Sequence, residues 1–123
     1  MERRYNTRTL GSDWEEQAAM YLQERGMRIV ERNFRCRQGE IDLIGYHDGY
    51  LVFVEVKYRS TDKNGSALEA VGVRKQQKIC RVADYYRYLH KIDDFAYIRY
   101  DVIAIQHGET KWIQNAFPHV YRK

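Results

Sequence analysis

The dipeptide Asp48-Gly49 constrains the fold more than any other feature of the sequence. It lies between two runs rich in β-branched, aromatic and other apolar residues, Glu40 to Tyr46 and Leu51 to Tyr58. Asp-Gly in such a position favours a two-residue turn because both residues tolerate a positive φ, and it is a strong signal for a β-hairpin. The sequence therefore predicts two antiparallel strands joined at this turn.

The rest of the chain predicts helices and strands around this hairpin. Apolar residues at helical spacing predict a helix from Ser12 to Arg25, with Gly26 as the residue that ends it. A second apolar stripe predicts a helix from Ser66 to about His90. The remaining predicted strands are Met27 to Phe34, Tyr97 to Ile105 and Lys111 to Phe117. The order α-β-β-β-α-β-β predicts an α/β fold in which helices flank a mixed β-sheet.

The size and composition fit one domain over residues 1–123, with residues 1–10 as a loose basic arm. The chain is 44% hydrophobic and 31% charged, which is typical of globular proteins. No apolar run reaches the ~18 residues of a membrane span and no apolar segment follows the basic start, so we expect a cytoplasmic protein without a membrane partner. Neither the two cysteines nor the histidines have the spacing of a zinc site.

The end of the hairpin away from the turn carries four charged residues. With Asp48-Gly49 at the turn, the antiparallel register pairs Asp42 with Glu55 and Glu40 with Lys57. All four side chains are then predicted to point to the same face. The opposite face is expected to be core and consists of Ile41, Leu43, Val52, Val54 and Val56. Two carboxylates that face each other repel, and a divalent cation would remove this conflict.

Asp42 and Glu55 are therefore candidate ligands of Mg²⁺ or Mn²⁺, and the main-chain carbonyl of Val56 could add an oxygen. Lys57 would point at the same site, where it could orient an attacking water or stabilise charge on a phosphate. Glu40 is a candidate accessory group. The same pattern also has a structural interpretation, in which Glu40 forms a cross-strand ion pair with Lys57 beside a solvated Asp42.

Glu15 has two interpretations that the residues alone leave open. Ser12-x-x-Glu15 fits a capping box, in which the glutamate bonds back to the main chain of Ser12. If the helix begins earlier, Glu15 lies on its face and adds an acidic group to the hairpin site. A second capping box, Ser66-x-x-Glu69, favours a structural role for Glu69.

Basic residues flank the acidic hairpin on both sides in the sequence. Each cluster alone is typical of a solvated face, but clusters on both sides indicate a track for phosphates. A net charge of +4 also favours nucleic acid as the partner. No base-reading motif is evident, so we expect recognition by shape. The candidate nucleic-acid contacts are Arg32, Arg35, Arg37, Arg59, Lys63, Arg74, Lys75 and Lys78.

Several segments resemble the YraN-like proteins, a bacterial family of predicted nucleases that is similar to archaeal Holliday-junction resolvases. The segments are Glu15 to Leu22, Arg32 to Arg35, Gly39 to Ile44, Val52 to Arg59, Arg99 to Val102 and Asn115 to Phe117. The resemblance implies the restriction-endonuclease-like PD-(D/E)xK core. It also implies a Mg²⁺- or Mn²⁺-dependent endonuclease that acts on structured or branched DNA, with DNA favoured over RNA.

By this resemblance Asp42 matches the motif aspartate, Glu55 the second acid and Lys57 the motif lysine. Glu15 matches the helical glutamate that completes such sites, which favours its catalytic interpretation. The family usually has glycine where this chain has Trp14, whose ring could fill core or narrow the access to Glu15.

Lys75 and Asp101 match recurrent family positions, and we expect a structural role at a strand end for Asp101. Two alternatives to the enzyme stay open. The protein could bind nucleic acid with little or no cleavage of its own and need a protein partner, or its acids could pair only with basic neighbours. Resolvases generally act as dimers, so a homodimer is also open, although the sequence shows no dimer face.

Overall fold

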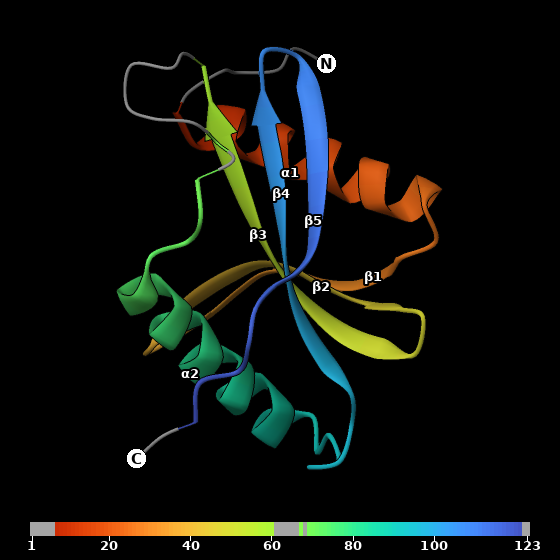
Figure 1. The fold of residues 1–123 in the computed structure, drawn as a ribbon, viewed down its shortest axis with the longest axis vertical. Coiled ribbons are helices and arrows are strands. Elements are labelled where there is room, and N and C mark those ends of the chain that lie inside the picture. Colours follow the sequence, from red (N-terminus) through yellow and green to blue (C-terminus); the bar gives the residue numbers. More distant parts are fainter. Residues whose placement is uncertain (1–6, 61–66, 68, 122–123) are drawn as a thin grey trace.

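The computed structural model describes residues 7–60, 67 and 69–121, the side chains of residues 7–12 excepted. One five-stranded sheet of order β1-β2-β3-β4-β5 lies between two helices, one on each face (Figure 1). The helices are α1 (Thr7–Glu24) and α2 (Val73–Leu89). The strands are β1 (Arg28–Cys36), β2 (Gly39–His47), β3 (Tyr50–Arg59), β4 (Ile98–Gln106) and β5 (Glu109–Phe117). Strands β3 and β4 are parallel and the other neighbours antiparallel, so the predicted order and mixed sheet are confirmed.

The β2–β3 hairpin forms around Asp48-Gly49 as predicted. These residues have φ angles of 51° and 82°, as the predicted two-residue turn requires. The paired register runs from His47 opposite Tyr50 to Leu43 opposite Val54. Beyond this pair, Oδ2 of Asp42 accepts the N–H of Val56 at 2.7 Å. A side-chain carboxylate therefore takes a main-chain donor at the end of the hairpin.

The side chains of the hairpin alternate between two hydrophobic cores. Ile44 and Phe53 pack beneath α2, whereas Leu43, Val52 and Val54 pack beneath α1.

The predicted core face is wrong at one position, Ile41, which packs beneath α2 and not with Leu43. Between the β1 partners of these two residues lies Asn33, whose φ of 52° is in the left-handed region. A residue in this region interrupts the extended alternation of β1, and Phe34, just beyond it, packs against the same core as its β2 partner Ile41.

Both helices begin at residues other than those predicted. Helix α1 begins at Thr7, so Ser12 lies inside the helix and part of the predicted arm is helical. Helix α2 begins at Val73 with Gly72 as its N-cap, and not at Ser66, which lies outside the described residues. No helix in the described part of the chain is long and apolar enough to cross a bilayer.

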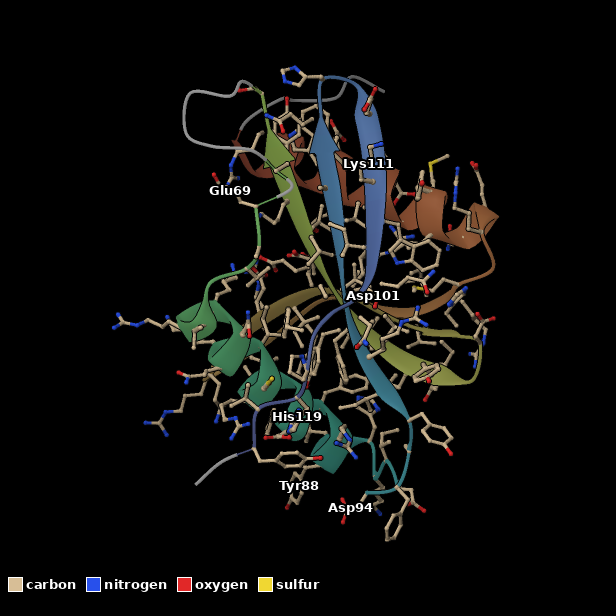
Figure 2. The ribbon with its side chains drawn as sticks, in the orientation of Figure 1. Glu69, Tyr88, Asp94, Asp101, Lys111 and His119 are labelled. Atoms are coloured by element: carbon tan, nitrogen blue, oxygen red, sulfur yellow. The ribbon has the colours of Figure 1, made fainter. Side chains whose placement is uncertain are left out.

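The described residues before α2, Ala67 and 69–72, are non-helical, and two of them are bonded to the sheet. The main-chain carbonyl of Glu69 accepts a hydrogen bond from Nζ of Lys57, and the N–H of Ala67 donates to the side chain of Gln106 at 3.0 Å. Glu69 lies beside the end of β3 in the connection to α2 (Figure 2). These tertiary contacts override the local capping signal of the sequence.

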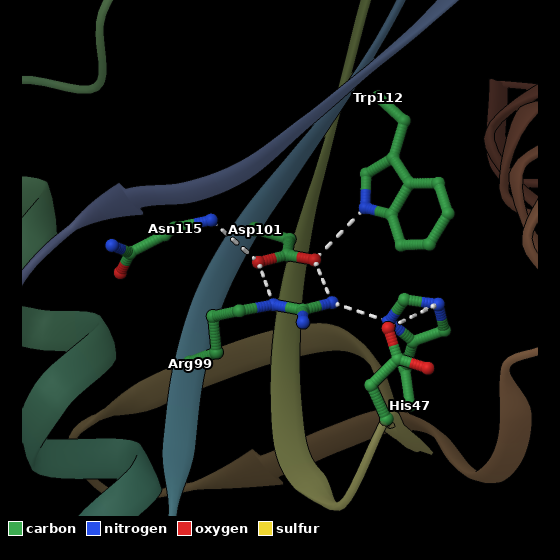
Figure 3. A network of polar contacts seen from close by, with 6 residues as sticks. His47, Arg99, Asp101, Trp112 and Asn115 are labelled. Carbon is green, nitrogen blue, oxygen red and sulfur yellow. Dashed lines mark hydrogen bonds and ion pairs between the residues drawn. The ribbon is translucent and has the colours of Figure 1, made fainter.

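Asp101 has a structural role, but inside β4 and not at its end. Its carboxylate accepts two hydrogen bonds from Arg99 at 2.9 Å and further bonds from Nε1 of Trp112 and the N–H of Asn115 (Figure 3). Arg99 also contacts Nδ1 of His47 at 2.9 Å. The network joins β2, β4 and β5 at a position where the β4–β5 register shifts.

Candidate metal and nucleic-acid site

Asp42 and Glu55 bring two carboxyl groups together where the β2–β3 register ends. Burial, followed by the negative charge of Glu55, raises the pKa of Asp42 to about 8. The side chain of Glu55 is only 13% exposed, so water screens this repulsion poorly. Two such carboxylates at neutral pH either share a proton or require a cation.

Lys75 supplies a positive charge to this pair. Its Nζ lies 2.9 Å from Oε2 of Glu55. The hydrogen bond to Glu55 raises the pKa of Lys75, and the charges of Asp42 and Glu40 act in the same direction. The structure thus places a predicted nucleic-acid contact directly on the acidic pair.

Lys57 lies two residues after Glu55 on β3. Its Nζ donates to the main-chain carbonyl of Glu69, and burial, followed by the charge of Arg59, lowers its pKa. The ion pair between Lys57 and Glu40, the structural alternative, is not among the described contacts, and Oε2 of Glu40 accepts from Nε of Arg35 at 2.8 Å.

Two pockets meet at the ion pair between Glu55 and Lys75. One pocket has a volume of about 420 Å³ and includes Lys57 and the Glu69 segment in its lining. The other has a volume of about 330 Å³, and Asp42 lines it. Glu55, Lys75 and Val56 line both, so the ion pair lies between the two.

Glu15 approaches the acidic pair from α1. Because α1 begins at Thr7, Ser12 is not the N-cap, which favours the interpretation that Glu15 belongs to the helix face. Burial raises the pKa of Glu15, a hydrogen bond to Asn33 lowers it, and its charge reaches Asp42. Nevertheless, no three His, Cys, Asp or Glu residues among those described form a group that could hold one metal ion. Glu15 therefore lies at the border of the site.

Some of the predicted nucleic-acid contacts are already engaged within the protein. Arg32 pairs with Glu16, and Arg35 pairs with Glu40. Arg59 is half-buried and its Nη1 donates to a main-chain carbonyl of β3 at 2.9 Å. These guanidinium groups would have to exchange partners to contact a phosphate.

Other predicted contacts are exposed, and they are Arg37, Arg74 and Lys78. Lys78 lines the same pocket as Asp42. Arg74 and Lys75 lie in the first turn of α2, which contains no acidic residue. Cations are unfavourable at this end of a helix dipole, so helix stability does not explain them. Lys63 lies outside the described residues.

Two contributors to the site are absent from the sequence-based prediction. One is the main-chain carbonyl of Glu69, and the other is Tyr58, whose ring stacks on Trp14 with centroids 3.9 Å apart. Of the two roles open for Trp14, packing is therefore the one observed. Gly72 is a sequence signal for the position of Glu69. Glycine is accepted at an N-cap, and a helix that begins after Gly72 leaves the main-chain carbonyl of Glu69 free to bond outside the helix.

Sequence comparison identifies the family of this chain. The model of an uncharacterised protein family, UPF0102, matches residues 14–105. The chain belongs to UPF0102. A UPF0102 protein of Lachnoclostridium phytofermentans is 42% identical over 112 residues, which cover 91% of this chain and 95% of that protein. Another, from Aeromonas hydrophila subsp. hydrophila, is 46% identical over 108 residues, which cover 87% and 83%. The family resemblance seen in the sequence segments is thus confirmed.

Two solved structures are also similar to this UPF0102 chain. A repair endonuclease from Pyrococcus abyssi matches with a TM-score of 0.44 and 17% identity, over 83% of this chain and 39% of that chain. The SfsA protein of Pyrococcus furiosus in complex with Ca²⁺ matches with a TM-score of 0.38 and 15% identity, over 90% and 63%. This chain therefore spans about two fifths of the endonuclease and just under two thirds of SfsA.

Proposed function

We propose that this protein is a Mg²⁺- or Mn²⁺-dependent endonuclease that hydrolyses phosphodiester bonds in structured or branched DNA in the cytoplasm. One observation carries the proposal. Asp42 and Glu55 are held side by side at the end of the hairpin, and the pKa of Asp42 is raised to about 8. Strongly shifted carboxyl groups beside lysines in a cleft are typical of functional sites.

The oxygen donors of this site fit a hard divalent cation. Proteins bind Mg²⁺ through one or two carboxylates, while waters and substrate phosphates complete its coordination. Asp42 and Glu55 would supply the carboxylates and Val56 a main-chain carbonyl. The cation, when bound, would polarise the scissile phosphate and lower the pKa of a bound water.

Lys57, which lines one pocket together with Glu55, is the group that would handle the attacking water. Burial lowers the pKa of its ammonium group, which therefore exchanges a proton more readily than an ordinary lysine. Its Nζ would orient the water and stabilise the charge that develops on the phosphate. The N–H of Val56 would keep the carboxylate of Asp42 in a fixed orientation.

DNA would be held by its phosphates. Arg37, Arg74 and Lys78 are exposed, and Lys78 lines the pocket with Asp42. Contacts from such residues to phosphates supply affinity that does not depend on base sequence. The proposal of DNA over RNA is supported by the resemblance to predicted nucleases that are similar to junction resolvases.

A second function is supported by the contacts of the two lysines. Lys75 already pairs with Glu55, and Lys57 already donates to Glu69. Such contacts also fit a nucleic-acid-binding module that has this fold but little intrinsic cleavage. It would need a protein partner or a second copy of the chain to become active.

Calorimetric titration of Mn²⁺ into the protein and into Asp42→Asn tests the proposal. Both proteins are then incubated with labelled junction, flap and linear DNA. We expect the variant to lose Mn²⁺ binding and cleavage while it keeps DNA binding. Asp48→Asn is a matched control, because it makes the same change at the exposed turn.

The other outcomes separate the two functions. Mn²⁺ binding without cleavage of any substrate would favour the binding module. Absence of Mn²⁺ binding by the unmodified protein would refute the endonuclease.

A further inference from the structure

The ion pair between Lys75 and Glu55 joins a displaceable cation to a fixed anion. The side chain of Lys75 is 56% exposed, whereas that of Glu55 is 13% exposed. Glu55 projects from β3, a strand that has neighbours on both sides. Lys75 has a flexible four-carbon stem, so its Nζ can leave Glu55 without any movement of the main chain.

The surrounding acids account for the position of the Lys75 ammonium group. Its Nζ forms a hydrogen bond with Glu55, and Asp42 and Glu40 contribute further negative charge. The first turn of α2 has no acidic residue that would attract it, and the helix dipole opposes it. The lysine is therefore a counter-ion of the acidic pair.

A divalent cation would need the same carboxylate. Oε2 of Glu55 lies 2.9 Å from Nζ of Lys75, a distance too short for another cation to share that oxygen without strong repulsion. The two pockets meet at this ion pair, since Glu55 and Lys75 line both. Movement of Nζ away from Glu55 would therefore join the two pockets into one groove.

We infer that Lys75 and a divalent cation are mutually exclusive partners of Glu55, so that cation binding displaces Nζ into the joined groove, where it meets a DNA phosphate. The inference rests on the proposed function and deepens it. Lys75 is a positioning residue. It neutralises the carboxylates until the cation replaces it, and it lowers the affinity of the site for the cation.

Calorimetric titration of Mn²⁺ into the full chain and into Lys75→Met tests this competition. Methionine keeps most of the aliphatic stem but carries no charge. We expect Lys75→Met to bind Mn²⁺ about tenfold more tightly, because loss of a nearby like charge is worth about 1.4 kcal/mol. Lys78→Met is the matched control. It removes the same charge one turn further along α2. Lys78 lines the pocket of Asp42, whereas the ion pair with Glu55 is formed by Lys75.

We expect Lys78→Met to change the affinity less than about threefold, since exposed Lys78 has no ion pair with Glu55 among the described contacts and solvent weakens its repulsion. Equal affinities of Lys75→Met and the unmodified protein would overturn the inference. An equal gain in both variants would overturn it too, because the effect would then be one of general charge.

Reductive methylation with mass-spectrometric detection gives a second measurement on the unmodified chain. We expect Mn²⁺ to increase the labelling of Lys75 and to leave that of Lys78 unchanged. Unchanged labelling of Lys75 under Mn²⁺ saturation would overturn the inference while the metal site stands. If neither the unmodified protein nor Lys75→Met binds Mn²⁺, the proposed function fails together with the inference.

Discussion

Replacement of Asp42 by asparagine is expected to stabilise the protein in the absence of divalent cations. Asparagine has nearly the same size, and its side-chain oxygen can still accept the N–H of Val56, which now donates to Asp42 at 2.7 Å. The change replaces a carboxyl group that must hold a proton or carry a second negative charge beside Glu55, a side chain that is only 13% exposed. It therefore isolates the electrostatic repulsion from the packing.

The raised pKa of Asp42 sets the size and the sign of the effect. The pKa is about 8 in the folded protein against 3.8 for a free aspartate, so the folded state holds the proton more tightly. The free energy of unfolding therefore falls as the pH rises between these two values. At pH 7 the loss is at most roughly 4 kcal/mol, at about 1.4 kcal/mol per pH unit. We expect the free energy of unfolding of Asp42→Asn at pH 7 to exceed that of the unmodified protein by about 1–3 kcal/mol. This is less than the limit, because the folded protein relaxes around the two carboxyl groups.

Urea denaturation in EDTA at pH 5 and at pH 7.5 measures the effect, with Asp48→Asn as the control. At pH 5 Asp42→Asn should be the more stable by at most roughly 1.6 kcal/mol, because unfolded Asp42 is ionised there while folded Asp42 holds its proton. At pH 7.5 the advantage of the variant should be larger, and saturating Mn²⁺ should stabilise the unmodified protein alone. A variant that is less stable at pH 7.5, or that gains equally at both pH values, would refute the reasoning.

Three further predictions concern other charged groups. Asp101→Asn should lower the free energy of unfolding by about 3 kcal/mol, because it leaves the buried guanidinium of Arg99 without its charge partner; a loss below about 1 kcal/mol in urea denaturation would contradict the structural role. Lys57→Met should reduce the rate of DNA cleavage by about 100-fold or more in single-turnover assays, with the Mn²⁺ affinity unchanged in calorimetry. A loss of Mn²⁺ affinity would instead assign Lys57 a role in metal binding. Arg74→Ala should weaken DNA binding uniformly across sequences and reduce the slope of log affinity against log salt by about 1; an unchanged slope in fluorescence anisotropy would remove this residue from the phosphate track.

The hairpin could be predicted from the sequence because its chemistry is local. The turn at Asp48-Gly49 sets the register, and the register places Asp42 near Glu55. The end of the paired strands could not be predicted, because there a side-chain carboxylate accepts the N–H of Val56. Ile41 lies in the other core, opposite Phe34, which follows the left-handed Asn33 on β1, and no pattern within the hairpin reports this.

The start of α2 was mispredicted for a related reason. Ser66-x-x-Glu69 is a local signal for a helix, but Lys57 and Gln106 bind the segment that contains Glu69 and Ala67. These contacts join residues far apart in the sequence. They also change the site, since the main chain of Glu69 becomes a partner of Lys57.

The contrast between Asp101 and the half-buried Asp42 supports a function for Asp42. Asp101 is fully buried, and four N–H donors and the charge of Arg99 satisfy its carboxylate. Asp42, two strands away, has the N–H of Val56 and, beside it, the like charge of Glu55. The same fold can therefore neutralise a buried aspartate completely, yet at Asp42 it places a second acid where a donor would stabilise. Among the described contacts Asp42 has the N–H of Val56 and no basic side chain of its own, since Lys75 pairs with Glu55. Such a carboxylate in a cleft can take its positive charge from solution, as a divalent-cation site requires.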